Sequence, residues 1–373
     1  MLNKRLADKP MSLMTLADLS TTQIATLIKL SLAYKTIATV YRTGGIISRL
    51  PKESVALIFN KRSTRTRVAS ETAITALGGS ALFLGKDDIQ LGVNESLEDT
   101  ARIIGSMTAG IMARVGEHVE VETLAQKAGV PVINALSDLW HPTQILADIM
   151  TMYEILTPAE QNPLSRFKSS NTPERDAFAL AEQIDPLAAL QGKKIVWVGD
   201  VNNVLNDMLV SLPRLGMKMA VAAPQGYDKV DPRVWKRVEE AGTADQILIT
   251  NSPAEALRDA DFVVTDTWIS MGQEAEKEAR LKAFNGFQVT EKLCQESGAK
   301  PDWKFLHCLP RKAEEVDDEV FYGPRSHVFR EGENRKWTIM ACFGSVLVGR
   351  DPTDRRADRN LNLRSTLFAT WTI

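Results

Sequence analysis

The chain has 373 residues, a length that favours two domains, and its composition, 44% hydrophobic and 25% charged, is typical of a soluble globular protein. Its formal net charge of −2 gives no electrostatic basis for binding nucleic acid or an anionic membrane, and no run of about 18 apolar residues is present to span a bilayer. Three scattered cysteines indicate a reducing compartment, and four histidines without a Cys-x-x-Cys pair argue against a zinc site.

The first half of the chain contains a basic turn between a strand and a helix. Apolar spacing predicts a helix over 21–41, then a buried strand over 55–59 and a helix that starts near residue 64 and ends at Gly78-Gly79. Four cationic and three hydroxyl side chains occupy the connecting stretch, 60–67. This stretch is either a solvated turn with an N-cap or an anion site, because the free amides of a helix N-terminus, arginine and hydroxyl groups all bind phosphate.

The rest of the first half alternates strand and helix, which predicts a parallel sheet covered on both faces. We expect strands at 81–84, 111–115 and 131–135, a helix from a Ser96/Asp99 capping box to about residue 107, a helix at 121–128, and another opened by His141-Pro142. Residues 157–191, rich in Pro, Ser, Asn and Glu, are interpreted as an inserted and partly mobile surface segment at the domain junction.

The second half restarts the same alternation and predicts a second, doubly wound α/β domain. Expected strands lie at 195–198, 219–222, 247–250, 262–265 and 305–309, and Ser252-Pro253 is typical of a helix start. A last helix begins after Glu331, and residues 350–373 are interpreted as a disordered tail. The predicted domains are therefore 1–150 and 151–345, with the last helix returning to the first domain.

Several polar residues follow predicted strands or open predicted helices, and each has an ordinary structural explanation beside a functional one. Arg114 is either an exposed strand end or an anion ligand. His141, a plain cap by itself, shares a helix face with Gln144, so the two could polarise a carbonyl and hold an NH₂ group. Asp266 follows a strand, and Cys308 is either a core thiol or a site thiol.

A dinucleotide site is not predicted. Gly199-Asp200 begins like a dinucleotide turn, but the second and third glycines that would admit a pyrophosphate are missing. We therefore expect no NAD, and neither a metal nor an organic cofactor.

Taken together, these segments resemble ornithine carbamoyltransferase, in the aspartate/ornithine carbamoyltransferase superfamily. The Ser-Thr-Arg-Thr-Arg and His-Pro-x-Gln elements are shared by carbamoyltransferases, whereas His-Cys-Leu-Pro with Asp-Thr-Trp-x-Ser-Met-Gly is specific to the ornithine branch. The matching stretches are 59–67, 91–102, 137–148, 198–205, 266–274, 305–311, 314–321 and 333–337. Val201, in place of a common glycine, the long 157–191 segment and the tail after Gly349 depart from the family pattern.

The resemblance implies a role for each matching residue. Carbamoyl phosphate would be held by a first set: Ser63, Thr64, Arg65, Thr66, Arg114, His141, Gln144, Cys308, Leu309 and, closing from the second domain, Arg335. Ornithine would be held by a second set: Asn203, Asp266, Ser270 and Met271. The catalytic residues would be Cys308, Asp266, His141 and Arg114.

The implied reaction is carbamoyl transfer from carbamoyl phosphate to L-ornithine, giving citrulline and phosphate, as in arginine biosynthesis and the urea cycle. The resemblance also implies a homotrimer with shared active sites. Transfer to another amine, such as putrescine or aspartate, and a catalytically silent paralogue acting as a regulatory partner are the alternatives. We expect a soluble intracellular protein, either cytoplasmic or, if a presequence is missing from this chain, in the mitochondrial matrix.

Overall fold

The structure is a computed structural model that describes residues 11–41, 47, 49–86, 95–269 and 276–346. The chain forms two compact units. Unit 1 comprises Met1–Met150, Thr157–Pro186 and Asn334–Ile373, and unit 2 comprises Thr151–Leu156 and Leu187–Glu333. The predicted tail and the predicted ornithine residues Ser270 and Met271 lie outside the described residues.

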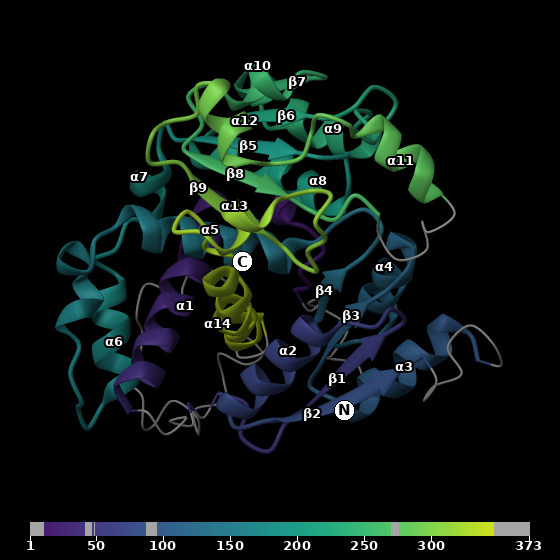
Figure 1. Ribbon diagram of the computed structural model, residues 1–373. Coiled ribbons are helices and arrows are strands. Elements are labelled where there is room, and N and C mark those ends of the chain that lie inside the picture. The colour runs from purple at the N-terminus through teal and green to yellow at the C-terminus, as the bar shows by residue number, and fades with distance from the viewer. Residues whose placement is uncertain (1–10, 42–46, 48, 87–94, 270–275, 347–373) are drawn as a thin grey trace. The chain divides into compact units, whose positions relative to one another are not determined.

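Unit 1 is built on a parallel sheet in the order β2-β1-β3-β4 (Figure 1). Its strands are β1 (Ser54–Phe59), β2 (Ser80–Gly85), β3 (Gly110–Arg114) and β4 (Val132–Leu136). The helices between and after them are α2 (Thr64–Ala76), α3 (Leu97–Met107), α4 (His118–Lys127) and α5 (Pro142–Leu156). Every residue of β3 is buried, as expected for a central strand covered on both faces.

The 157–191 segment, predicted as an inserted surface segment, contains regular secondary structure. It contains the 3₁₀ turns Ala159–Gln161 and Pro163–Arg166 and the helices α6 (Pro173–Ala181) and α7 (Pro186–Leu190). Phe178 of α6 is fully buried and its ring meets that of Tyr34, in α1 (Thr21–Tyr41), at 5.6 Å. Pro173 and Pro186 each occupy the first position of a helix, where proline is well tolerated.

The C-terminal helix α14 (Val328–Val346) starts before Glu331, earlier than predicted. From Asn334 onward its residues belong to unit 1, where Lys35 Nζ of α1 donates to Asn334 Oδ1 (2.8 Å). Arg335 is therefore part of unit 1.

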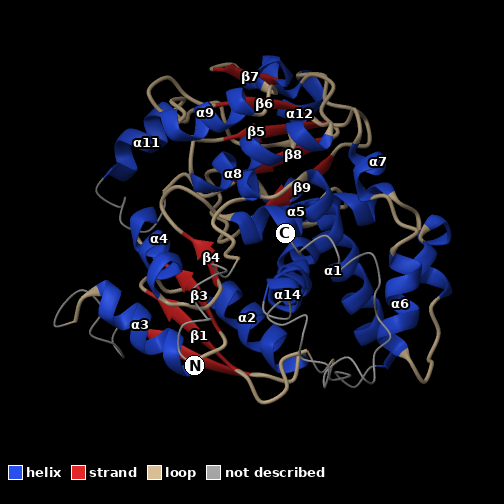
Figure 2. Cartoon of the chain, turned by 180° about the vertical axis from the view of Figure 1, so that it is seen from behind, coloured by secondary structure: helices blue, strands red, loops and turns tan. Residues whose placement is uncertain are grey.

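Unit 2 is built on a five-stranded parallel sheet in the order β7-β6-β5-β8-β9. Its strands are β5 (Lys194–Val198), β6 (Lys218–Ala222), β7 (Ile247–Thr250), β8 (Phe262–Thr265) and β9 (Lys304–His307). Helices cover both faces of this sheet (Figure 2): α8 (Asn203–Ser211), α9 (Pro232–Glu240), α10 (Pro253–Leu257), α11 (Lys277–Ala283), α12 (Glu291–Glu296) and α13 (Asp318–Tyr322). Two 3₁₀ turns, Pro213–Leu215 and Ala244–Gln246, complete the unit.

Strand β9 ends at His307, two residues before the predicted limit. Leu309 lies in the left-handed region at φ 62°, so the chain has already left the strand when it reaches Cys308 and Leu309. Both side chains are only half-buried. The early end of the strand thus brings the thiol and the leucine into the loop at the carboxyl end of the sheet.

Each sheet has one point where the strand order reverses. In unit 1 the reversal falls between β1 and β3, and in unit 2 it falls between β5 and β8. Ligands of open α/β sheets bind beyond the carboxyl ends of the strands at such a point. None of the described helices is both long and apolar enough to cross a membrane.

Candidate functional site

The first candidate site lies at the reversal point of unit 1, where α2 begins. Ser63 is the N-cap and accepts the backbone N–H of Thr66 at 3.3 Å, because its extended backbone places the hydroxyl below the first helical turn. Across the reversal point, Phe59 of β1 pairs with Arg114 of β3, and Arg114 is only 8% exposed. The amide-rich helix end and a buried arginine therefore lie at one edge of the sheet.

Arg335 joins three parts of this site. Its Nη1 donates to Gln144 Oε1 (2.7 Å), and its Nη2 donates to the hydroxyls of Thr66 (3.2 Å) and Thr143 (3.3 Å). Gln144 in turn donates from Nε2 to Asp148 Oδ1 at 2.8 Å. These contacts fix the side chains of α2 and α5 with respect to each other and determine which way the Gln144 amide faces.

His141 is the neutral group of a cationic cluster. The side chain is 5% exposed and immediately precedes α5. Burial lowers its pKa well below the usual value, and the charges of Arg335, Arg114 and Arg65 lower it further. At neutral pH the ring is therefore an uncharged imidazole, which can still donate one hydrogen bond to a carbonyl oxygen.

Not every cation of the basic turn belongs to this cluster. Arg67 pairs with Glu71 of the same helix at 2.9 Å and lies over the ring of Phe83, 3.6 Å from its centroid. Arg65, by contrast, is one of the three charges that act on His141. The cluster can bind an anion through Arg65, Arg114 and Arg335, and can polarise a carbonyl through His141.

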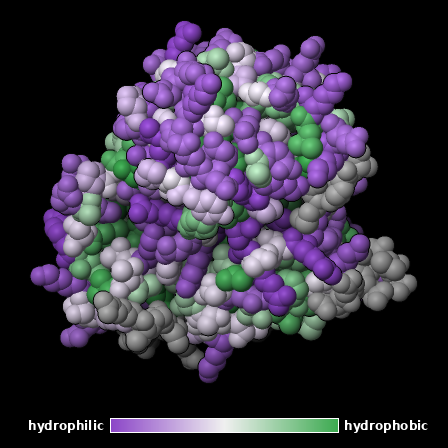
Figure 3. All heavy atoms as spheres, in the orientation of Figure 1, coloured by the Kyte–Doolittle hydropathy of each residue, from purple (hydrophilic) through white to green (hydrophobic). Residues whose placement is uncertain are grey.

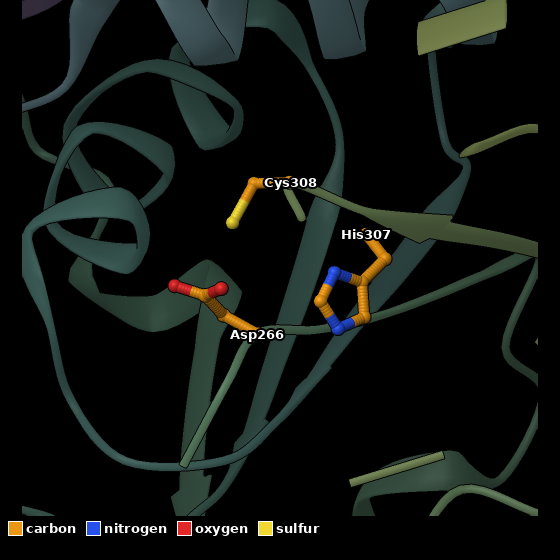
Figure 4. Close-up of side chains that lie close together, drawn as sticks. All are labelled: Asp266, His307 and Cys308. Carbon is orange, nitrogen blue, oxygen red and sulfur yellow. The ribbon is translucent and has the colours of Figure 1, made fainter. Parts of the chain in front are cut away.

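The second candidate site lies at the reversal point of unit 2, where Asp266 follows β8 and Cys308 follows β9. One ligating atom each of Asp266, His307 and Cys308 lies within 4.8 Å of the others (Figure 4). Asp266 is 8% exposed, and its carboxylate accepts the backbone N–H of Thr267 (2.7 Å) and Asn202 Nδ2 (3.1 Å). The carboxylate oxygens of Asp266 and the thiol of Cys308 can accept hydrogen bonds from an amine.

The ring of His307 is committed to the protein rather than to a ligand. Its Nδ1 accepts the backbone N–H of Leu309 at 2.8 Å, which leaves the proton of the neutral ring on Nε2, 3.4 Å from Glu315 Oε1. The His307 backbone N–H donates to Glu331 Oε2 at 2.9 Å. With its Nδ1 lone pair engaged, this histidine does not complete a metal-binding triad with Asp266 and Cys308.

The first turn of α8 supplies the remaining described candidate. Asn202 caps the helix, accepting the backbone N–H groups of Val204 (3.0 Å) and Leu205 (3.1 Å), while its amide nitrogen bonds Asp266. Asn203, the predicted ornithine residue, is the first residue of the helix and is half-buried. Asn202 was not predicted as a site residue, although its place after a strand at the reversal point was a usable signal.

Comparison with known proteins assigns a family to each half. Residues 11–154 match the carbamoyl-P binding domain of aspartate/ornithine carbamoyltransferase, and residues 191–346 match its Asp/Orn binding domain. The chain belongs to the aspartate/ornithine carbamoyltransferase family. The residues of the second site lie within 191–346, and those of the first lie within 11–154 except Arg335, which falls in the 191–346 match.

Individual relatives agree with this assignment. The mitochondrial ornithine carbamoyltransferase of Emericella nidulans is 46% identical over 91% of this chain and 90% of its own length. That of Schizosaccharomyces pombe is 47% identical over 91% of this chain and 95% of its own. The crystal structure of the Coccidioides immitis mitochondrial enzyme has a TM-score of 0.76 at 40% identity, covering 91% of this chain and 98% of that chain. The structure of the Pyrococcus furiosus ornithine carbamoyltransferase has a TM-score of 0.75 at 37% identity, covering 91% of this chain and 97% of that chain.

Proposed function

We propose that this chain is an ornithine carbamoyltransferase, which transfers the carbamoyl group of carbamoyl phosphate to the δ-amine of L-ornithine and releases citrulline and phosphate. The observation that carries the proposal is the 46–47% identity, over 91% of the chain, to relatives that bear this name. The chemistry of the two sites supports it, since one offers cations for a phosphate and the other offers acceptors for an amine.

Carbamoyl phosphate is proposed to bind unit 1. Ser63, Thr64, Arg65 and Thr66 at the start of α2 supply backbone and side-chain donors to the phosphate. Arg114 and Arg335 supply the other positive charges of the cationic cluster around the phosphate. His141 and Gln144 hold the carbamoyl end, with the neutral ring of His141 donating to the carbonyl oxygen and Gln144 bonding the NH₂ group.

Ornithine is proposed to bind unit 2. Asp266 accepts from the amines and Asn203 takes part in binding, together with Ser270 and Met271, which lie outside the described residues. The resemblance assigns Cys308 and Leu309 to both substrates. An alkylamine has an unperturbed pKa of roughly 10, so at neutral pH only about one ornithine in a thousand carries a nucleophilic δ-amine. Asp266 and Cys308 orient the amine, and one of them accepts its proton.

The reaction then needs only positioning and charge stabilisation. The neutral amine attacks the carbonyl carbon, and the C–N bond forms as the C=O π electrons move onto oxygen. Arg114, Thr66 and His141 stabilise the resulting oxyanion. The C–O bond to phosphate breaks as the carbonyl reforms, the phosphate leaves among the arginines, and the proton lost by nitrogen is taken up at the Asp266 and Cys308 edge.

A substrate panel tests the proposal. The purified chain is incubated with carbamoyl phosphate and L-ornithine, putrescine or L-aspartate, and the ureido product is measured by colorimetry, with each substrate omitted in turn. Of the three amines, we expect only L-ornithine to give a ureido product, and only when carbamoyl phosphate is present. Product with another amine, or none with any amine, would replace the proposal by one of the two alternatives.

We further propose a homotrimer with shared active sites, located in the mitochondrial matrix. Exposed apolar side chains on unit 1 support an assembly: Val68 on α2, Leu82 on the edge strand β2, Ile103 and Met107 on α3, and Val119 on α4. On the face in Figure 3, hydrophobic side chains are interspersed among a majority of hydrophilic ones. The names of the fungal relatives support the compartment. Light scattering and organelle fractionation, respectively, test the two statements.

A further inference from the structure

Arg280 forms a buried cross-link at the reversal point of unit 2. The side chain belongs to α11 and the residue is 6% exposed. Its Nη1 donates both to Asp200 Oδ2 and to the backbone oxygen of Trp268, each at 2.9 Å. Its guanidinium lies over the ring of Tyr227 at 4.9 Å, and its Nε donates to Glu276 Oε2 at 3.1 Å.

The two groups that share Nη1 follow the two strands on either side of the reversal point. Asp200 comes after β5 and Trp268 comes after β8. The backbone of Asp200 is also fixed, because Trp197 Nε1 donates to its carbonyl oxygen at 2.9 Å. One guanidinium group therefore holds the loops after β5 and β8 at a set separation.

The same two loops carry the amine site. Asn202 stands two residues after Asp200, and Asp266 stands two residues before Trp268. Asn202 Nδ2 donates to Asp266 Oδ2 at 3.1 Å, a contact that the separation of the two loops determines. A shift of these loops would change the direction of the Asp266 carboxylate without removing it.

We propose that Arg280 and Asp200 are positioning residues that fix the direction of the Asp266 carboxylate and thereby set the affinity for ornithine, without touching either substrate. The inference rests on the proposed function, and it deepens that function by assigning a role in ornithine affinity to residues outside both substrate sets. A loss of this pair changes ornithine binding and leaves carbamoyl phosphate binding intact, because the hydrogen bonds described for the pair lie within unit 2.

Unit 2 contains a matched arginine at the opposite end of the sheet. Arg325 bonds the carboxylate of Glu291 (2.7 Å) and the backbone oxygens of Pro301 (2.8 Å) and Trp303 (3.2 Å), and lies over the Trp303 ring at 4.9 Å. Pro301 and Trp303 precede β9, whereas the proposed site follows it. Arg325 thus makes the same kinds of contact as Arg280 but away from the substrate edge, and serves as the control for a purely structural effect.

The test measures initial rates of citrulline formation by the full chain, varying each substrate against the other. The variants are Arg280→Gln, Arg280→Lys, Asp200→Asn, the double variant Asp200→Asn/Arg280→Gln, and the control Arg325→Gln. For Arg280→Gln we expect the KM for ornithine to rise roughly tenfold, the size of coupling usual within one hydrogen-bonded network. The KM for carbamoyl phosphate stays within about twofold. Arg280→Lys recovers part of the loss, and the double variant is no worse than Arg280→Gln.

Other outcomes overturn the proposal in distinguishable ways. An unchanged KM for ornithine, an equal rise in both KM values, or the same change in Arg325→Gln would each remove the positioning role. If Arg280→Gln does not fold, Arg280→Lys and Asp200→Asn, which keep the charge or the size of the side chain, decide by the same criteria. A wild-type chain that makes no citrulline would instead remove the proposed function and the inference with it.

Discussion

The carboxyl edges of the two sheets share a topology and differ in charge. At the edge of unit 1, Arg114 and Arg335 are buried together with Thr66 and the imidazole of His141. At the edge of unit 2, the buried groups include the carboxylates Asp200 and Asp266. Both edges are reversal points of a parallel sheet, so topology explains where a ligand binds and the side chains explain which ligand it is.

The two edges also differ in how the surroundings shift the pKa of a buried titratable group, His141 in unit 1 and Asp200 in unit 2. Positive neighbours and burial both lower the pKa of His141, so that site favours negative ligands and keeps its imidazole neutral. Burial raises the pKa of Asp200 to about 6 even though Arg280 is paired with it. The Asp200 carboxyl therefore takes up a proton at a higher pH than an ordinary aspartate does.

The largest predicted effect is the loss of turnover in a unit 2 variant that keeps its fold. Asp266→Asn should lower kcat for citrulline formation by roughly 100- to 1,000-fold, because an amide does not accept the amine proton. Asp261, at the other end of the same strand, accepts the Lys194 backbone N–H at 2.8 Å and provides the control. Asp261→Asn should keep kcat within about twofold. A fully active, folded Asp266→Asn enzyme would exclude this carboxylate from catalysis.

The next prediction breaks the phosphate site of unit 1. Arg65→Ala should lower kcat/KM for carbamoyl phosphate by about 100-fold, since loss of one preorganised charged donor costs on the order of 3 kcal/mol. Arg67→Ala, two residues along, is the matched control, because Arg67 is engaged with Glu71 and Phe83. Steady-state kinetics would contradict the assignment if both variants lost equal activity.

A third prediction concerns pH: the group whose titration controls the rate is the δ-amine of ornithine. Between about pH 6 and 8.5, activity at subsaturating ornithine should rise close to tenfold per unit, following the fraction of neutral amine. His141 should contribute no step there, because its lowered pKa keeps the ring neutral throughout. NMR of the imidazole nitrogens checks this directly, and a His141 ring that is protonated at pH 6.5 would be inconsistent with it.

The smallest predicted effect is on stability. The pKa of Asp200 is about 6 in the folded chain and 3.8 as its ordinary value. A raised pKa means that the folded state binds the proton of the Asp200 carboxyl more tightly than the unfolded state does. Proton binding by Asp200 therefore stabilises the fold fully below about pH 3.8, and this stabilisation is lost as pH rises through 6. Relative to Asp200→Asn, the wild-type free energy of unfolding should fall by roughly 2 kcal/mol from pH 4 to 7. Urea titrations measure it, and a difference independent of pH would contradict the raised pKa.

Much of the fold could be predicted because the strands are short apolar runs bounded by clear signals. Ser252-Pro253 and Ser63-Thr64 marked helix starts through their hydroxyl caps, and both serines do accept the expected backbone N–H. The segment 157–191 could not be predicted in the same way. Its helix α6 is held by the burial of Phe178 against α1, which lies more than a hundred residues earlier.

The sequence could mark candidate site residues but not the contacts that hold them. His141, Asp266 and Cys308 stand out because they follow strands or open helices. Arg280 carries no local signal, since a helical arginine is ordinarily a solvated charge and its partners Asp200 and Trp268 come from two other segments. Likewise, nothing local shows that Arg335 bonds Thr66 and Gln144 within unit 1.

The division of ligands between the two edges can be measured by calorimetry with a non-hydrolysable phosphonate analogue of carbamoyl phosphate. The analogue is titrated into Arg65→Ala, Asp266→Asn and the wild-type chain. We expect Arg65→Ala to weaken binding of the analogue by about 100-fold and Asp266→Asn to leave its dissociation constant within about twofold of wild type. Weakened binding in Asp266→Asn together with wild-type binding in Arg65→Ala would contradict the assignment of phosphate to unit 1.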